Sequence, residues 1–158
     1  MTGLTIDVAR PTDDDVRALL ERHLAFANDH SPGEHVHALD VDGLLDPAVT
    51  FFAARSDGDV VGVGALRQLT DTHIELKSMH TAAAARGRGV GAAMVGRLLA
   101  EARDRGCTRV SLETGTGAAF EPAHALYAAH GFAQCEPFGT YTADDFSICM
   151  TLDLAAGG

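Results

Sequence analysis

A glycine-rich stretch between a predicted strand and a predicted helix constrains the fold of this chain more than any other feature. The stretch reads RGRGVG over residues 86–91, and apolar residues at helical spacing from Val90 onward predict a helix that begins within it. Backbone N–H groups at a helix N-terminus can cradle an anion, and glycine lets a ligand approach them closely. Arg86 and Arg88 add positive charge. The stretch therefore favours a strand–loop–helix unit that holds a small anionic group.

Several interpretations explain why the chain has glycines, which carry no side chain, at this position. Residues 87–92 match the G-x-G-x-x-A dinucleotide fingerprint, and Glu113 follows about twenty residues later, where a ribose-binding acid is expected. Against this, AAAA separates the glycines from their strand, a three-strand meander precedes them, and 158 residues are few for a complete dinucleotide-binding sheet. A P-loop is excluded because no Gly-Lys-Ser/Thr follows. The dinucleotide site stays a rival interpretation, beside a tight turn with close helix packing and a pyrophosphate cradle for another ligand.

Apolar periodicity along the rest of the chain predicts a mixed α/β sheet. Asp57 and Gly58 separate two β-rich runs in residues 49–69, a pattern typical of a hairpin. Further strands are predicted at residues 4–9, 73–81, 109–113, 132–138 and 146–154, and helices at 16–26, 90–105 and 119–130. Residues 38–47 fit a short helix or a turn. Hairpins in the first half and a β-α-β unit in the second argue against regular βαβ alternation.

Charge and hydropathy narrow the classes of partner. The net charge is −10 and Lys77 is the only lysine, so we expect no nucleic-acid partner. No apolar run is long enough to span a membrane and the first residues do not resemble a secretion signal, so we expect no membrane partner and a cytoplasmic protein. Eight histidines include the close pair His35 and His37, but no carboxylate or cysteine set completes a site, so no metal is predicted.

Three stretches together resemble the GNAT superfamily of N-acetyltransferases. Residues 86–91 fit its acyl-CoA signature Q/R-x-x-G-x-G/A, HIELKSMHT at residues 73–81 is similar to its fourth strand, and ALYAAHGF at 125–132 resembles its L-Y-x-x-x-G-F element. The order of the elements is also similar. SPGEHVHALDVDGL, LETGT and PFGTY…SICMTLDL resemble a subgroup of small bacterial members.

The resemblance implies one domain over residues 1–158, with a mixed sheet of six or seven strands flanked by helices. Its fourth and fifth strands are expected to separate and admit acetyl-CoA. The implied activity is transfer of the acetyl group to a primary amine of an unidentified small molecule, peptide or protein. A non-catalytic acyl-CoA-binding regulator on the same fold is the alternative. Homodimers are common in the family, so a homodimer is possible here.

The resemblance also implies which residues hold acetyl-CoA. The pyrophosphate is expected on the backbone of Arg86, Gly87, Arg88, Gly89, Val90, Gly91 and Ala92. The end of the preceding strand is expected to offer backbone groups to the pantetheine arm at Met79, His80 and Thr81. A backbone N–H near Met79 is expected to donate to the thioester oxygen. Many members have Asn where this chain has Phe120, so that contact with the pantetheine arm differs here.

Two residues are the candidates for proton transfer. The resemblance implies that Tyr127 matches the family's tyrosine and acts as general acid toward the leaving thiolate. It implies that Glu75 matches the family's glutamate and acts as the general base. Strand alternation predicts that Glu75, Lys77, Met79 and Thr81 share one face. The alternatives are packing for Tyr127, a surface salt bridge from Glu75 to Lys77 or Arg67, and water as the base.

Four residues are candidates for the acceptor pocket, with core or loop packing as the alternative for each: Phe26, His35, Phe138 and Tyr141. The loop after the first helix commonly borders this pocket in the family. The acidic balance of the chain weakly favours a cationic amine.

Overall fold

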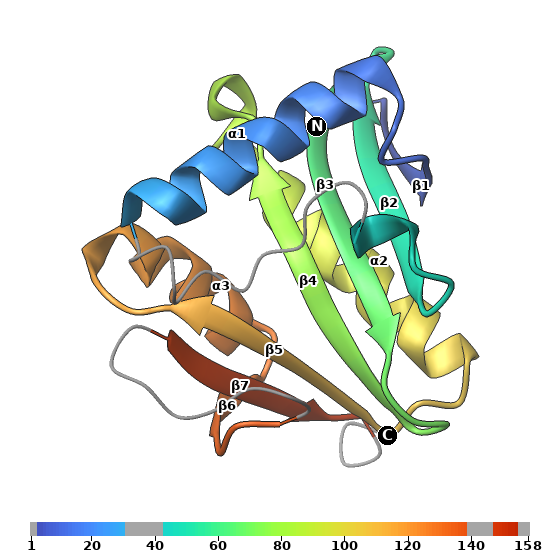
Figure 1. Cartoon of the computed structure of the whole chain (residues 1–158), viewed down its shortest axis with the longest axis vertical. Coiled ribbons are helices and arrows are strands. Elements are labelled where there is room, and N and C mark those ends of the chain that lie inside the picture. The colour runs from blue at the N-terminus through green and yellow to red at the C-terminus, as the bar shows by residue number, and fades with distance from the viewer. Residues whose placement is uncertain (1–2, 31–42, 139–146, 155–158) are drawn as a thin grey trace.

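A seven-stranded mixed sheet organises the chain, whose computed structural model describes residues 3–30, 43–138 and 147–154 (Figure 1). The strands lie in the order β1-β2-β3-β4-β5-β7-β6. Their bounds are β1 Leu4–Val8, β2 Val49–Ser56, β3 Asp59–Gln68, β4 His73–Thr81, β5 Arg109–Gly115, β6 Ala133–Cys135 and β7 Ser147–Asp153. The expected mixed sheet is confirmed. So is the hairpin, because Asp57 (φ 52°) and Gly58 (φ 88°) form the tight turn between β2 and β3.

Three helices cover the two faces of the sheet. α1 (Asp14–His30) lies across one face, over β3 and β4, while α2 (Val90–Asp104) and α3 (Glu121–Ala129) lie on the other (Figure 1). Short 3-10 turns occur at η2 Gly43–Leu45, η3 Ala83–Ala85 and η4 Ala118–Phe120. No helix within the described ranges is long and apolar enough to cross a membrane.

Apolar side chains form a separate cluster on each face. The larger cluster joins α2 to the sheet through residues such as Leu66, Val95 and Leu98, each fully buried. The smaller one packs Val16 and other residues of α1 against Phe51 and its neighbours. α1 and α2 therefore each bury one apolar stripe, as their spacing predicts.

Strands β4 and β5 pair only over their first halves. They run parallel with His73 opposite Arg109 and Leu76 opposite Leu112, and no β4–β5 partner follows in the described register. β5 continues beside β7 as far as Gly115. The two strands diverge beyond this point (Figure 1), which confirms the expected separation.

A β-bulge interrupts β4 just after the two strands separate. Ser78 has a left-handed φ of 57°. The pairing with β3 shifts there, because Ala65 lies opposite Lys77 whereas Val63 lies opposite His80. One extra residue is thus inserted in β4, which reverses the face of every later side chain.

The predicted common face of four β4 residues is therefore wrong. Glu75 and Lys77 lie on the α1 face of the sheet. Met79 packs on the α2 face, where its Sδ would be 2.9 Å from a Cβ placed on Gly64. Thr81 also lies on the α2 face, opposite Gly62. Alternation fails because it assumes an unbroken strand, and the bulge at Ser78 breaks it.

Candidate active site

The loop before α2 holds its glycines in a backbone conformation that other residues rarely adopt. Gly87 has φ 77° and Gly89, the N-cap of α2, has φ 82°. A Cβ at either glycine would meet nothing within 4 Å. Arg86 and Arg88 are exposed beside them. Glycine is needed here for its left-handed φ, and the space above this backbone is open.

The third glycine of the motif has a different role. A Cβ on Gly91 would lie 3.1 Å from Leu126 Cδ2 of α3 and 3.8 Å from Thr81 Oγ1. Gly91 therefore lets α2 and α3 pack closely, as the alternative interpretation proposed for such glycines. Val90 is buried in the core, and Ala92 is exposed. The first N–H groups of α2 still lack intrahelical acceptors, which leaves them available to an anion.

The bulge in β4 gives the strand end an unusual backbone. The register with β3 provides opposite residues for Lys77 and His80 but none for Ser78 and Met79. Ser78 is 8% exposed, and its Oγ is buried without a hydrogen-bond partner among the described residues. No sequence signal predicts this serine, because its importance comes from the bulge. The segment of β4 that is expected to contact the thioester of acetyl-CoA is thus irregular at Ser78 and Met79.

Glu75 and Lys77 form a buried ion pair beside the bulge. Lys77 Nζ lies 3.1 Å from Glu75 Oε2, and their side chains are 8% and 4% exposed. The pair agrees with one alternative for Glu75, except that it is buried rather than on the surface. An ion pair removed from water needs both partners, because either charge alone would be costly.

A hydrogen-bonded polar row continues this face of the sheet onto β5 and β7. His73 Nε2 lies 2.7 Å from Ser111 Oγ, which lies 2.9 Å from Thr151 Oγ1. Ser111 is fully buried and lies opposite Glu75. Burial and the nearby Arg109 lower the pKa of His73. The α1 face is therefore polar over these strands and apolar over β2 and β3.

Tyr127 is buried in α3. It is 6% exposed and its ring contacts Phe132 at a centroid distance of 5.9 Å. Burial raises the pKa of the phenol well above its usual value, so the hydroxyl keeps its proton at any working pH. Packing and hydrogen-bond donation are both compatible with this position.

Aromatic rings from three elements form a wall beyond the separation of β4 and β5. The Phe26 ring of α1 contacts the ring of Phe120 at 5.5 Å and that of His80 at 6.3 Å. Phe120 packs on Gly115 at the end of β5, where a Cβ would lie 2.5 Å from its Cζ. Three predicted site residues thus meet in the structure, two of them (His80 and Phe120) predicted for acetyl-CoA and one (Phe26) for the acceptor pocket.

A second histidine that the sequence did not single out completes this wall. The ring of His23 lies 5.3 Å from that of His80, and its Nδ1 is buried without a hydrogen-bond partner in the described structure. Burial lowers the pKa of both imidazoles to about 4, with Arg86 and Arg22 contributing at His80 and with His80 contributing at His23. Both rings are therefore uncharged near neutral pH.

One other acceptor-pocket candidate, Phe138, lies apart from this wall. Phe138 lies beside His73, with ring centroids 5.8 Å apart. His35 and Tyr141 lie outside the described residues. Within the described ranges no three His, Cys, Asp or Glu side chains gather as a metal site requires.

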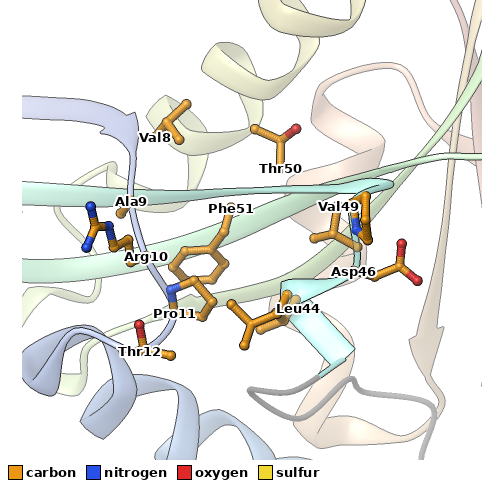
Figure 2. A pocket seen from close by; sticks show the side chains of 12 residues that line it. Val8, Ala9, Arg10, Pro11, Thr12, Leu44, Asp46, Val49, Thr50 and Phe51 are labelled. Atoms are coloured by element: carbon orange, nitrogen blue, oxygen red, sulfur yellow. The ribbon is translucent and has the colours of Figure 1, made fainter.

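A hollow of about 330 Å³ lies elsewhere, where β1 leads into α1. Pro11, Leu44 and Phe51 surround it (Figure 2), and Val8 at its edge is 64% exposed. No residue predicted for cofactor or acceptor lines this hollow.

Comparison with known proteins identifies similar chains. Residues 14–132 match the model of the acetyltransferase (GNAT) family. The uncharacterized N-acetyltransferase YedL of Escherichia coli is 44% identical over 150 residues, which cover 95% of this chain and 92% of the relative. The crystal structure of an acyl-CoA N-acyltransferase from Klebsiella pneumoniae is 30% identical, with a TM-score of 0.82 and coverage of 96% and 97%.

A more distant structure that shares the fold contains acetyl-CoA. It is a GNAT family acetyltransferase from Elizabethkingia anophelis with acetyl-CoA bound, 16% identical, with a TM-score of 0.73 and coverage of 98% of this chain and 100% of the other. At this identity the likeness concerns the fold alone.

Proposed function

The chain belongs to the GNAT family of acetyltransferases, and from this premise we propose that it transfers the acetyl group of acetyl-CoA to a primary amine. One observation carries the proposal for this chain. Gly87 and Gly89 hold left-handed backbone with open space above it, at the end of the sheet where β4 and β5 separate. A ligand with a pyrophosphate and a long arm fits this combination of cradle and parted strands.

We assign the pyrophosphate to the start of α2. The first N–H groups of α2 carry the positive end of the helix dipole, and the exposed side chains of Arg86 and Arg88 add charge-assisted hydrogen bonds. Two arginines beside the glycines stand out in a chain whose net charge is −10. The local charge therefore favours an anion despite the overall balance.

We assign the pantetheine arm to the backbone of β4 after the bulge. β5 no longer pairs with this segment, so an extended ligand can add to it as a strand does. The Met79 N–H, which lies in the bulge, is the proposed donor to the thioester oxygen as negative charge develops there. Where many family members have an asparagine, this chain has Phe120, whose ring packs on Gly115 at the end of β5.

Tyr127 is the proposed donor to the leaving sulfur. Its raised pKa makes full proton transfer unfavourable, so the hydroxyl stabilises the thiolate mainly as a hydrogen-bond donor. Glu75 is the base that the resemblance suggests, and the polar α1 face around it supports an acceptor site there. The acceptor is a primary amine of a small molecule or peptide, and a homodimer in the cytoplasm is the proposed state of the protein.

A turnover screen tests the proposal. The purified chain is mixed with acetyl-CoA and a panel of simple amines, amino acids, aminoglycosides and peptides with free N-termini, and released thiol is measured. Acetylation of at least one amine, verified by mass, is the expected result. Tight acetyl-CoA binding without turnover on any amine would instead favour the non-catalytic regulator.

A further inference from the structure

We propose that the imidazole of His80 accepts the proton that the amine loses as it attacks the thioester. The inference rests on the acetyl transfer proposed above and adds a catalytic residue to it. The sequence assigned His80 only through its backbone. The bulge at Ser78 changes this assignment, because it turns the side chain of His80 to the face that Glu75 and Lys77 share.

The position of His80 follows from the geometry of β4. His80 comes directly after Met79, the proposed main-chain donor to the thioester oxygen, and lies past the point where β5 leaves β4. Its half-buried ring faces α1, where Phe26 and His23 contact it. These rings restrict the imidazole and form a largely apolar wall, which limits water around a transferring proton.

Glu75 is less suited to take the proton. Its Oε2 is 3.1 Å from Lys77 Nζ, and both side chains are buried. The ion pair therefore holds the Glu75 carboxylate within the sheet, where its 4% exposed side chain is little accessible to an amine. We therefore assign Glu75 a positioning role, in which it holds Lys77 on the polar α1 face of the sheet.

The protonation state of His80 suits a base. Burial, together with Arg86 from the cradle and Arg22 from α1, lowers its pKa to about 4, so the ring is neutral and has a free lone pair near pH 7. His23, the other titratable group packed against it, is neutral as well. A pyrophosphate bound at Arg86 would compensate that positive charge, so binding of the acetyl donor makes His80 a stronger base.

The chemical step balances with one proton moved to His80. A neutral amine attacks the carbonyl carbon, a C–N bond forms, and the C–S bond then breaks with its electron pair going to sulfur. The nitrogen becomes strongly acidic as its lone pair enters the new bond, so even a weak base can accept its proton. The thiolate leaves with a hydrogen bond from Tyr127 and takes a proton from solvent, and His80 returns its proton to solvent.

His80→Gln tests the proposal, because glutamine fills similar space but cannot accept a proton at neutral pH. The assay uses acetyl-CoA and the fastest amine of the panel above. We expect kcat to fall about 100-fold or more, while the acetyl-CoA Kd from calorimetry changes less than about 2-fold. His130→Gln is the matched control and keeps its kcat; His130 is a half-buried histidine at the end of α3 whose ring Nδ1 lies 3.0 Å from the Leu126 carbonyl oxygen.

Chemical rescue separates a base from a packing role. Added imidazoles should partly restore turnover of His80→Ala, and the rescued rate should rise with the pKa of the added base. Glu75→Gln is assayed beside it, because Glu75 is the base that the family resemblance suggests. If His80→Gln keeps wild-type kcat, or if rescue does not depend on the pKa of the added base, the assignment of His80 is wrong while acetyl transfer stands. If the wild-type chain acetylates no amine, both proposals fall together.

Discussion

Lys77 Nζ and Glu75 Oε2 lie 3.1 Å apart within a part of the sheet where each side chain is less than 10% exposed. The pair lies on β4, two residues apart on one face, immediately before the bulge that redirects the strand. A lone lysine in a chain of this charge is thus used to neutralise a buried carboxylate rather than to bind a ligand at the surface.

Loss of one partner of this pair should destabilise the protein strongly. Glu75→Gln or Lys77→Met alone should lower the free energy of unfolding by about 3 kcal/mol, because each removes the direct ion-pair partner of a buried charge, whereas the double variant should recover much of the loss. Urea denaturation measures all three. Glu21→Gln, which removes the exposed partner of Arg17, is the control and should cost less than about 1 kcal/mol. Strictly additive single losses would contradict the direct pairing.

The two neutral imidazoles make stability depend on pH. His23 and His80 have a pKa of about 4 in the folded state against 6.5 for the ordinary group, so the unfolded chain binds more protons between these values. The contribution of the two neutral imidazoles to the free energy of unfolding is fully present above about pH 6.5. It decreases as the pH falls from 6.5 to about 4 and changes no further below that. At about 1.4 kcal/mol per pKa unit, the loss is about 3 kcal/mol for His23 and less for the more exposed His80.

Urea denaturation between pH 4 and 7 provides the measurement. His23→Leu removes one of the two groups and should flatten the slope of the free energy of unfolding over this range. His124→Leu is the comparison, since it removes a histidine outside the ring wall. Identical slopes for wild type and His23→Leu would show that His23 ionises freely in the folded protein.

Gly115 and Phe120 should behave as a coupled pair. A methyl group at Gly115 would lie 2.5 Å from Phe120 Cζ, so Gly115→Ala must displace the ring and with it the contact to Phe26. We expect a loss of about 1–3 kcal/mol in the free energy of unfolding from Gly115→Ala, and little further loss when Phe120→Ala is already present. Denaturation of the four chains in this cycle measures the coupling. Equal costs of Gly115→Ala in both backgrounds would show that the ring moves aside freely.

The sequence predicted those parts of the fold that depend on local pattern. The tight turn at Asp57 and Gly58 and the start of α2 at Val90 occur where residue type and periodicity indicate them. The separation of β4 and β5 was predicted only through the family resemblance. Nothing local to either strand encodes it, because it depends on which strands become neighbours.

The face of the site residues could not be predicted in the same way. One left-handed residue, Ser78, reverses alternation in β4, and serine carries no strong signal for a positive φ. His23 lies on α1, far from His80 in sequence, so their contact depends on how α1 packs over β4. The burial of Glu75 likewise follows from neighbouring strands rather than from its own surroundings in the chain.

Calorimetric titration with acetyl-CoA tests the central claim, that the left-handed glycines before α2 form the acetyl-CoA cradle. Gly89→Ala adds a methyl group where the backbone has φ 82°, and Gly106→Ala adds one at φ 78° beyond the other end of α2. Neither methyl group meets an atom within 4 Å, so both variants carry a similar strain of about 1 kcal/mol. We predict that Gly89→Ala weakens acetyl-CoA binding at least about 10-fold while Gly106→Ala binds as the wild type does. Equal affinity in all three chains would contradict the claim.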